Sequence, residues 1–256
     1  MRAFPSAILI LGASLAATGP GMAETLRTEY QQIELEAVIQ GLDEPWGMAF
    51  LPDGRLLVTE RTGRLLRIDN GQAQEISGTP EVAARGQGGL LDVALHPDFE
   101  TNRLVYLTWS QAGPDGVNSA TTLSRARLDG DRLVDLEQLF IQDRFSTPGR
   151  HYGSRLAWLP DGTLLMSIGD RGAAPPRAQD ITDHAGSLLR LNDDGTPAAD
   201  NPFIGLEGAK PEIWSYGHRN IQGLLVHPET GTVWATEHGP RGGDELNLIT
   251  PGANYG

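Results

Sequence analysis

Two polar residues at the outer ends of a predicted hairpin have the types needed for a base and its orienting carboxylate. His151 stands just before one apolar β-rich run, and Asp170 follows the next run along the chain. The Asp161-Gly162 turn between the runs predicts antiparallel pairing, which returns their outer ends to the same side. A carboxylate there can hydrogen-bond one ring nitrogen of the histidine and leave the other as a general base. A purely structural His–Asp pair is the competing interpretation.

The segment from Trp214 to Asn220 places aromatic, basic and amide side chains directly before another β-rich run. Arg219 and Asn220 lie side by side in it, and they offer a planar guanidinium fork and an amide. Such a pair suits a carboxylate or a quinone oxygen. The alternative is an arginine that only ties down a neighbouring loop.

A glycine-rich loop from Glu237 to Asn247 concentrates acidic side chains and backbone carbonyls. Calcium favours oxygen ligands of these kinds, and a solvated acidic loop is the alternative interpretation. Zinc hydrolase chemistry is excluded by spacing, because His218, His227 and His238 are nine and eleven residues apart, without the close histidine pair of such enzymes. The sequence also has no nucleophile-elbow or phosphate-loop motif.

The elements that must position these residues are predicted by a phrase that occurs four times. Each copy has an apolar run, a proline followed by an acidic residue, and a second apolar run. The prolines are Pro52, Pro97, Pro160 and Pro228, spaced by 45, 63 and 68 residues. Repeated sheets of about four antiparallel strands, at about 40–50 residues with insertions, indicate an all-β propeller. A β-sandwich is the alternative, but sandwiches lack such a repeat.

The remaining histidines receive structural interpretations. His96 and His227 each come directly before the proline of a repeated phrase, which indicates a role in the turn. His184 has no evident partner in the sequence, so we expect a surface or packing residue.

Composition restricts the function classes. The chain has 256 residues, with 33 acidic against 20 basic side chains, and its formal charge is −13. Such acidity argues against nucleic acid as a partner, because nucleic-acid binders usually present a basic face. The absence of cysteine excludes disulfides, thiolate metal sites and cysteine nucleophiles.

Residues 1–23 have the layout of a cleaved signal peptide. Arg2 supplies a positive start, residues 7–17 are an apolar run, and Gly21 and Ala23 are the small residues that a signal peptidase reads. The run is too short to span a bilayer, so we expect export to the periplasm without stable membrane insertion. Residues 24–256 are then expected to form one propeller domain. The fourth repeat begins only about 35 residues before Gly256, which predicts that the last blades are missing.

Taken together, the motifs resemble the soluble pyrroloquinoline quinone (PQQ)-dependent glucose/sorbosone dehydrogenases, and more closely their aldose sugar dehydrogenase branch. The resemblance runs from about Leu42 to Gly256. It is carried by segments 86–91, 151–155 with 169–170, 215–220, 237–247 and 254–256. It implies a six-bladed propeller of four-stranded antiparallel blades, of which roughly the last two are missing. It also implies oxidation of the anomeric hydroxyl of aldoses to lactones, with PQQ and Ca²⁺ as cofactors and a separate electron acceptor.

The resemblance implies roles for the matched polar residues. His151 matches the general base, which takes the proton from the anomeric hydroxyl while hydride passes to the quinone carbon. Asp170 matches the carboxylate that orients this histidine. Gln87, Arg219 and Asn220 match cofactor contacts, and Arg219 would stabilise charge that develops on the quinone oxygen.

The resemblance also implies two calcium sites. The backbone carbonyls of Gly239 and Pro240 match ligands of the calcium that polarises the cofactor. Asp244, Glu245 and the carbonyl of Tyr255 match a second, structural calcium. Two other classes stay open, namely a calcium-dependent lactonase-type hydrolase and a non-catalytic binding propeller. The Arg219–Asn220 pair argues against the first, and a His–Asp pair beside a cation loop argues against the second.

Overall fold

The computed structural model describes residues 24–147, 149–172 and 175–256, so the predicted signal peptide lies outside the described residues. The chain divides into two compact units, Met1–Gln40 and Gly41–Gly256. In the first unit, β1 (Glu24–Arg27) and β2 (Gln32–Leu35) pair as an antiparallel hairpin. No helix in the described part of the chain is long and apolar enough to cross a bilayer.

The second unit contains four antiparallel sheets, each built from strands that are consecutive in the chain. The first sheet has β3 (Pro45–Phe50), β4 (Leu56–Glu60), β5 (Leu65–Asp69) and β6 (Gln72–Ile76). The second has β7 (Leu90–Leu95), β8 (Leu104–Ala112), β9 (Ser119–Asp129) and β10 (Arg132–Ile141). The third has β11 (Leu156–Trp158), β12 (Leu164–Ile168), β13 (Ser187–Leu191) and β14 (Ile213–Tyr216). The fourth has β15 (Ile221–Val226), β16 (Val233–Glu237) and β17 (Glu245–Ile249).

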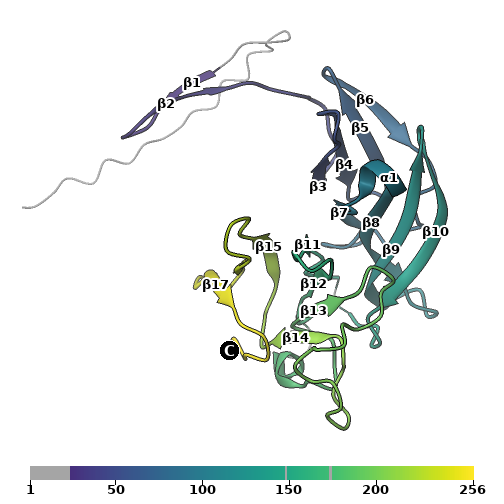
Figure 1. Cartoon of the computed structure of the whole chain (residues 1–256), viewed down its shortest axis with the longest axis vertical. Coiled ribbons are helices and arrows are strands. Elements are labelled where there is room, and N and C mark those ends of the chain that lie inside the picture. Colours follow the sequence, from purple (N-terminus) through teal and green to yellow (C-terminus); the bar gives the residue numbers. More distant parts are fainter. Residues whose placement is uncertain (1–23, 148, 173–174) are drawn as a thin grey trace, which may run out of the picture. The chain divides into compact units, whose positions relative to one another are not determined.

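These sheets are the blades of a β-propeller, which confirms the all-β architecture predicted from the repeats. The first strands of successive blades are neighbours, since β3 contacts β7, β7 contacts β11, and β11 contacts β15. Figure 1 shows the blades following one another in chain order. Each copy of the repeated phrase forms the first two strands of a blade, with the proline in the turn between them.

The turns between first and second strands are closed by local hydrogen bonds. Gly54 N–H donates to the Leu51 carbonyl at 2.9 Å, which closes the turn before β4. His96 Nδ1 accepts the Asp98 N–H at 3.0 Å, and His227 Nδ1 accepts the Glu229 N–H at 3.2 Å. The predicted turn role of both histidines is therefore confirmed.

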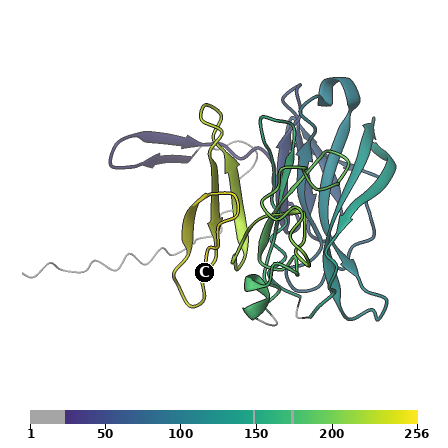
Figure 2. The same cartoon turned by 60° about the horizontal axis from the view of Figure 1, so that its bottom comes forward.

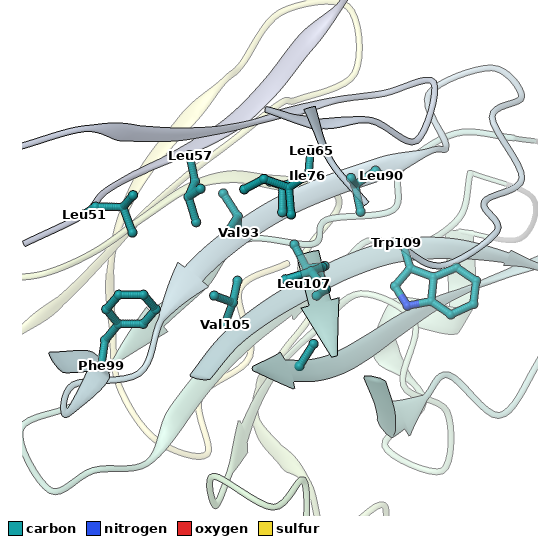
Figure 3. Packing of buried hydrophobic residues seen from close by; sticks show 12 residues of the cluster. Leu51, Leu57, Leu65, Ile76, Leu90, Val93, Phe99, Val105, Leu107 and Trp109 are labelled. Carbon is teal, nitrogen blue, oxygen red and sulfur yellow. The ribbon is translucent and has the colours of Figure 1, made fainter. Parts of the chain in front are cut away.

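Apolar side chains fill the space between adjacent blades. Between the first and second blades, Leu57 and Leu65 pack with Leu90 and Leu107, and all four are fully buried (Figure 3). Similar clusters lie between the second and third blades and between the third and fourth. Burying one such leucine contributes about 1.5–3 kcal/mol, so these clusters are the main force that stacks the blades.

In each of the first three blades, a buried hydroxyl group on the second strand adds a polar link to the next blade. Thr108 Oγ1 on β8 accepts the Asp92 N–H of its own blade at 2.9 Å and donates to the Ser154 carbonyl of the next blade at 2.8 Å. Thr59 on β4 and Ser167 on β12 link the first to the second and the third to the fourth blade in the same way. In the first two blades, a bulge in the first strand frees the N–H that the hydroxyl accepts.

Two short helices mark the two ends of the strands. Helix α1 (Phe99–Asn102) lies in the β7–β8 connection, and the 3-10 helix η1 (Pro175–Gln179) lies in the β12–β13 connection. Figure 2 shows them at opposite ends of the sheets. The predicted site residues around His151 and Asp170 belong to the connections at the η1 end.

Candidate active site

The β11–β12 hairpin brings His151 and Asp170 into direct contact. His151 Nδ1 and Asp170 Oδ1 are 2.6 Å apart, and the two residues are only 8% and 7% exposed. The same carboxylate oxygen accepts the Gly172 N–H at 2.6 Å. His151 Nε2 makes no hydrogen bond with the described residues. The pair therefore has one ring nitrogen fixed by a carboxylate and the other free to exchange a proton.

The Gly169-Asp170 motif has a steric basis. A Cβ atom added to Gly169 would lie 2.2 Å from the His151 carbonyl oxygen and 3.0 Å from Asn220 Oδ1. A contact under 3.0 Å to backbone cannot be tolerated without a shift, so only glycine allows the segments before β11 and after β12 this close approach. The close approach sets the short distance between the two catalytic candidates.

Two amide side chains hold the loop that carries His151. Gln87 Oε1 accepts the His151 N–H at 2.7 Å, and Asn220 Oδ1 accepts the Gly153 N–H at 3.1 Å. Gln87, Gly153 and Asn220 line a cavity of about 280 Å³ together with His238. The structure thus places the two predicted cofactor amides against the predicted base, where each supports the loop through its carbonyl oxygen.

A buried arginine lies beneath the same loop. Arg171 is completely buried, its guanidinium lies 3.5 Å from the centre of the Tyr152 ring, and its Nη1 donates to the Arg150 carbonyl at 2.6 Å. Burial lowers the pKa of Arg171, because the charged form loses its water. Its contacts thus hold the backbone before His151 and the side chain after it.

Arg219 lies at a second cavity, of about 300 Å³, beside the His151–Asp170 pair. Its Nη1 donates to the His238 carbonyl at 2.7 Å, and its own carbonyl accepts the Asp170 N–H at 2.8 Å. Asp170, Arg219, Gly239, Pro240, Glu245 and Tyr255 all line this cavity. Among the described residues, the Arg219 guanidinium forms no ion pair with a carboxylate. Its positive charge is therefore available to an anionic group in the cavity.

Of the predicted calcium ligands, Gly239, Pro240, Glu245 and Tyr255 line this cavity, whereas Asp244 lines a neighbouring one with Glu245. Asp244 Oδ1 accepts the Gly239 N–H at 2.9 Å, and Glu245 Oε2 accepts the Asn247 Nδ2–H at 2.9 Å. The Gly239 N–H and His238 lower the pKa of Asp244, because both stabilise its ionised form. The described residues contain no group of three or more acidic or histidine side chains spaced to hold a metal ion. A cation here would need backbone carbonyls as well.

Sequence reasoning missed two buried histidine–carboxylate sites. His184 was expected to lack a partner, and this was wrong: its Nδ1 lies 3.0 Å from Asp143 and its Nε2 lies 3.2 Å from Glu212. His218 Nδ1 lies 2.9 Å from Glu237. No local pattern announces these partners, since they are 19 to 41 residues away in sequence.

Comparison with known proteins adds to this geometry. The family model described as Glucose / Sorbosone dehydrogenase matches residues 42–256. The chain is 49% identical to an uncharacterized protein of Synechocystis, over 91% of this chain and 61% of that protein. It is 42% identical to the aldose sugar dehydrogenase of Escherichia coli, over 88% of this chain and 61% of that enzyme. The PQQ-bound aldose sugar dehydrogenase of Streptomyces coelicolor superimposes with a TM-score of 0.75 and 35% identity, over 94% of this chain and 67% of that one.

The chain thus spans about 60% of the length of these two curated relatives. The match covers all four blades, including the segments around His151, Asp170 and Arg219. By this match, the chain belongs to the glucose/sorbosone dehydrogenase family.

Proposed function

We propose that the protein oxidises the anomeric hydroxyl of aldose sugars to lactones, with PQQ as the hydride acceptor. The observation that carries this proposal is the 2.6 Å contact between His151 and Asp170 beside the cavity lined by Arg219. A base, its orienting carboxylate and an unpaired cation are what hydride abstraction from a sugar alcohol requires of the protein.

The residues of the two cavities fit the chemistry of PQQ. This cofactor carries three carboxylates and has to bind to a chain with a formal charge of −13, so local positive charge is needed. The Arg219 guanidinium supplies it, since it has no carboxylate partner among the described residues. Gln87 and Asn220 line the neighbouring cavity and offer amide groups for polar atoms of the cofactor. When bound, PQQ supplies the electrophilic quinone carbon that receives the hydride.

The chain's own residues would perform the proton chemistry. Asp170 accepts the Nδ1 proton of His151, which leaves Nε2 as the basic nitrogen and fixes the plane of the ring. Nε2 would take the proton from the anomeric hydroxyl as the hydride departs from the carbon that bears this hydroxyl. Arg219 would stabilise the negative charge on the acceptor oxygen.

Calcium is proposed from the chemistry of the donor set. The carbonyls of Gly239 and Pro240 would hold the cation at the cofactor, where it acts as a Lewis acid. The carboxylates of Asp244 and Glu245 and the carbonyl of Tyr255 would hold a second, structural cation. Oxygen-only donors of this kind suit calcium better than zinc or copper.

The remaining expectations complete this proposal. We propose that the whole protein forms a closed six-bladed ring, that residues 24–256 belong to its propeller domain, and that residues 1–23 direct export to the periplasm. The reoxidation of the cofactor would require an electron acceptor.

The test is an assay of the full-length protein with PQQ, Ca²⁺, an aldose and an artificial electron acceptor. We expect sugar-dependent reduction of the acceptor, and His151→Ala should lower kcat by about 10²–10⁴, the usual contribution of a general base. His227→Ala is the matched control, because the hydrogen bonds that its ring makes with the described residues all stay within its own turn. Unchanged turnover in His151→Ala would exclude the proposed base. Lactone hydrolysis without PQQ would favour the hydrolase class, and absence of both activities would favour a binding propeller.

A further inference from the structure

Glu237, at the end of β16, is a buried carboxylate whose two oxygens are both occupied by donors. Oε1 lies 2.9 Å from His218 Nδ1 and accepts the Asn247 Nδ2–H at 3.0 Å. Oε2 accepts the backbone N–H groups of Arg219 at 2.7 Å and Asn220 at 3.3 Å. Although burial opposes its charge, the hydrogen bond with His218 and these N–H groups lower the pKa of Glu237. The carboxylate is therefore a fixed internal acceptor, although the sequence places it in the acidic loop.

His218 extends this contact into the third blade. Its Nε2 lies 2.8 Å from Ser215 Oγ, and its ring stacks on Tyr255 with 4.8 Å between centroids. The order serine, histidine and carboxylate is that of a nucleophilic triad. Ser215 and His218 have no exposed surface, however, so no substrate can reach the hydroxyl group. The role of these three side chains is therefore structural, inside the protein.

The segment that Glu237 holds, Arg219–Asn220, also supports both His151 and Asp170. The Arg219 carbonyl accepts the Asp170 N–H at 2.8 Å. Asn220 Oδ1 accepts the Gly153 N–H at 3.1 Å, two residues after His151. Glu237 therefore lies two hydrogen bonds from the backbone of Asp170 and two from the loop of His151.

We propose that Glu237 is a positioning residue, which fixes the His151–Asp170 pair through the backbone of Arg219 and Asn220. Its meaning for catalysis rests on the proposed function. Loss of the carboxylate would leave the part-buried N–H of Arg219 and the buried N–H of Asn220 without acceptors, and such groups are costly to leave unpaired. The segment would move to satisfy them, and the supports of Asp170 and Gly153 would move with it.

Two substitutions separate the hydrogen bonds from the charge. Glu237→Met removes both oxygens and keeps a similar length and volume. Glu237→Gln keeps one oxygen, which can face the N–H groups of Arg219 and Asn220. Its NH₂ group would then face His218 Nδ1, which can accept if the ring proton moves to Nε2 and donates to Ser215 Oγ. Asn247 Nδ2 would lose its contact with residue 237 and keep the one with Glu245.

The experiment measures the proton between His151 Nδ1 and Asp170 in the 256-residue chain, by NMR of ¹⁵N-histidine-labelled protein. Comparison with His151→Gln assigns the resonance. We expect Glu237→Met to shift this resonance and to speed exchange of the proton with water by about tenfold or more, because its supports open more often. Glu237→Gln should retain the resonance of the unsubstituted chain.

Glu212→Met is the matched control, because it removes another histidine–carboxylate contact, the part-buried one with His184. The hydrogen bonds of His184 do not reach the His151–Asp170 pair. Glu212→Met should therefore leave the resonance unchanged. If Glu237→Met does not fold, Glu237→Asp takes its place, since its shorter side chain draws the carboxylate away from Arg219 and Asn220 and should produce the same shift. An unchanged resonance in the folded variant, or an equal shift in Glu212→Met, overturns the proposal.

This measurement requires neither PQQ nor sugar, so it can fail independently of the proposed function. A shifted resonance in Glu237→Met together with normal turnover in His151→Ala would leave the positioning role intact and refute the oxidation mechanism. The opposite pair of results would retain His151 as the base and remove the role of Glu237.

Discussion

Replacing Thr108 with valine tests whether the buried hydroxyl groups hold the blades together. Valine keeps the branched shape of threonine and replaces the hydroxyl with a methyl group. Thr108 and Ser154 are fully buried and Asp92 is 5% exposed, so water cannot take over the lost contacts. The Asp92 N–H, bonded at 2.9 Å, and the Ser154 carbonyl, bonded at 2.8 Å, would both lose their partner.

Each buried group left unpaired costs about 1–3 kcal/mol, so Thr108→Val, which leaves two, should lower the free energy of unfolding by about 2–6 kcal/mol. Thr108→Ser is the control, since it keeps the hydroxyl and loses one methyl group, which is worth about 1 kcal/mol. Urea unfolding of the chain, followed by fluorescence of its five tryptophans, measures both variants. If valine proves no more destabilising than serine, the hydroxyl does not link the second and third blades.

Two further substitutions test the site and the charge of a buried histidine. Gly169→Ala should destabilise the fold by about 1–3 kcal/mol, because its Cβ would lie 2.2 Å from the His151 carbonyl oxygen; an unchanged urea midpoint would contradict this close approach. Although burial opposes the charge, hydrogen bonds that the His184 ring donates to Asp143 and Glu212 raise the pKa of His184, and Lys210 pairs with the same Asp143. This stabilisation is complete below the unfolded pKa of about 6.5 and is lost as pH rises through the folded pKa, at up to about 1.4 kcal/mol per pH unit. The urea midpoint of the unsubstituted chain should therefore decrease as the pH is raised from 6 to 8, and that of His184→Gln should decrease less. An equal decrease in both would show that another group titrates.

Features that depend on neighbouring residues could be predicted from the sequence. The repeated phrase predicted the blades, because alternating apolar residues and turn glycines define a hairpin locally. The same local rule brought His151 and Asp170 together, since the outer ends of a two-strand hairpin must lie on one side. The turn roles of His96 and His227 followed from their position before a proline.

Contacts between side chains that are far apart in the sequence were decided by the tertiary structure alone. The partners of His184 and the acceptor role of Glu237 join residues 17 to 41 positions apart, and two acidic residues of the same type look alike in a sequence. Both Glu237 and Glu245 line the cavity, but Glu245 is exposed, whereas Glu237, eight residues earlier, is 5% exposed and binds backbone N–H groups. Whether a carboxylate meets donors or solvent depends on how the strands pack and on which groups lose their water. The sequence thus determined the blades and the local hairpin pair, and contacts between distant segments determined which charges support that pair.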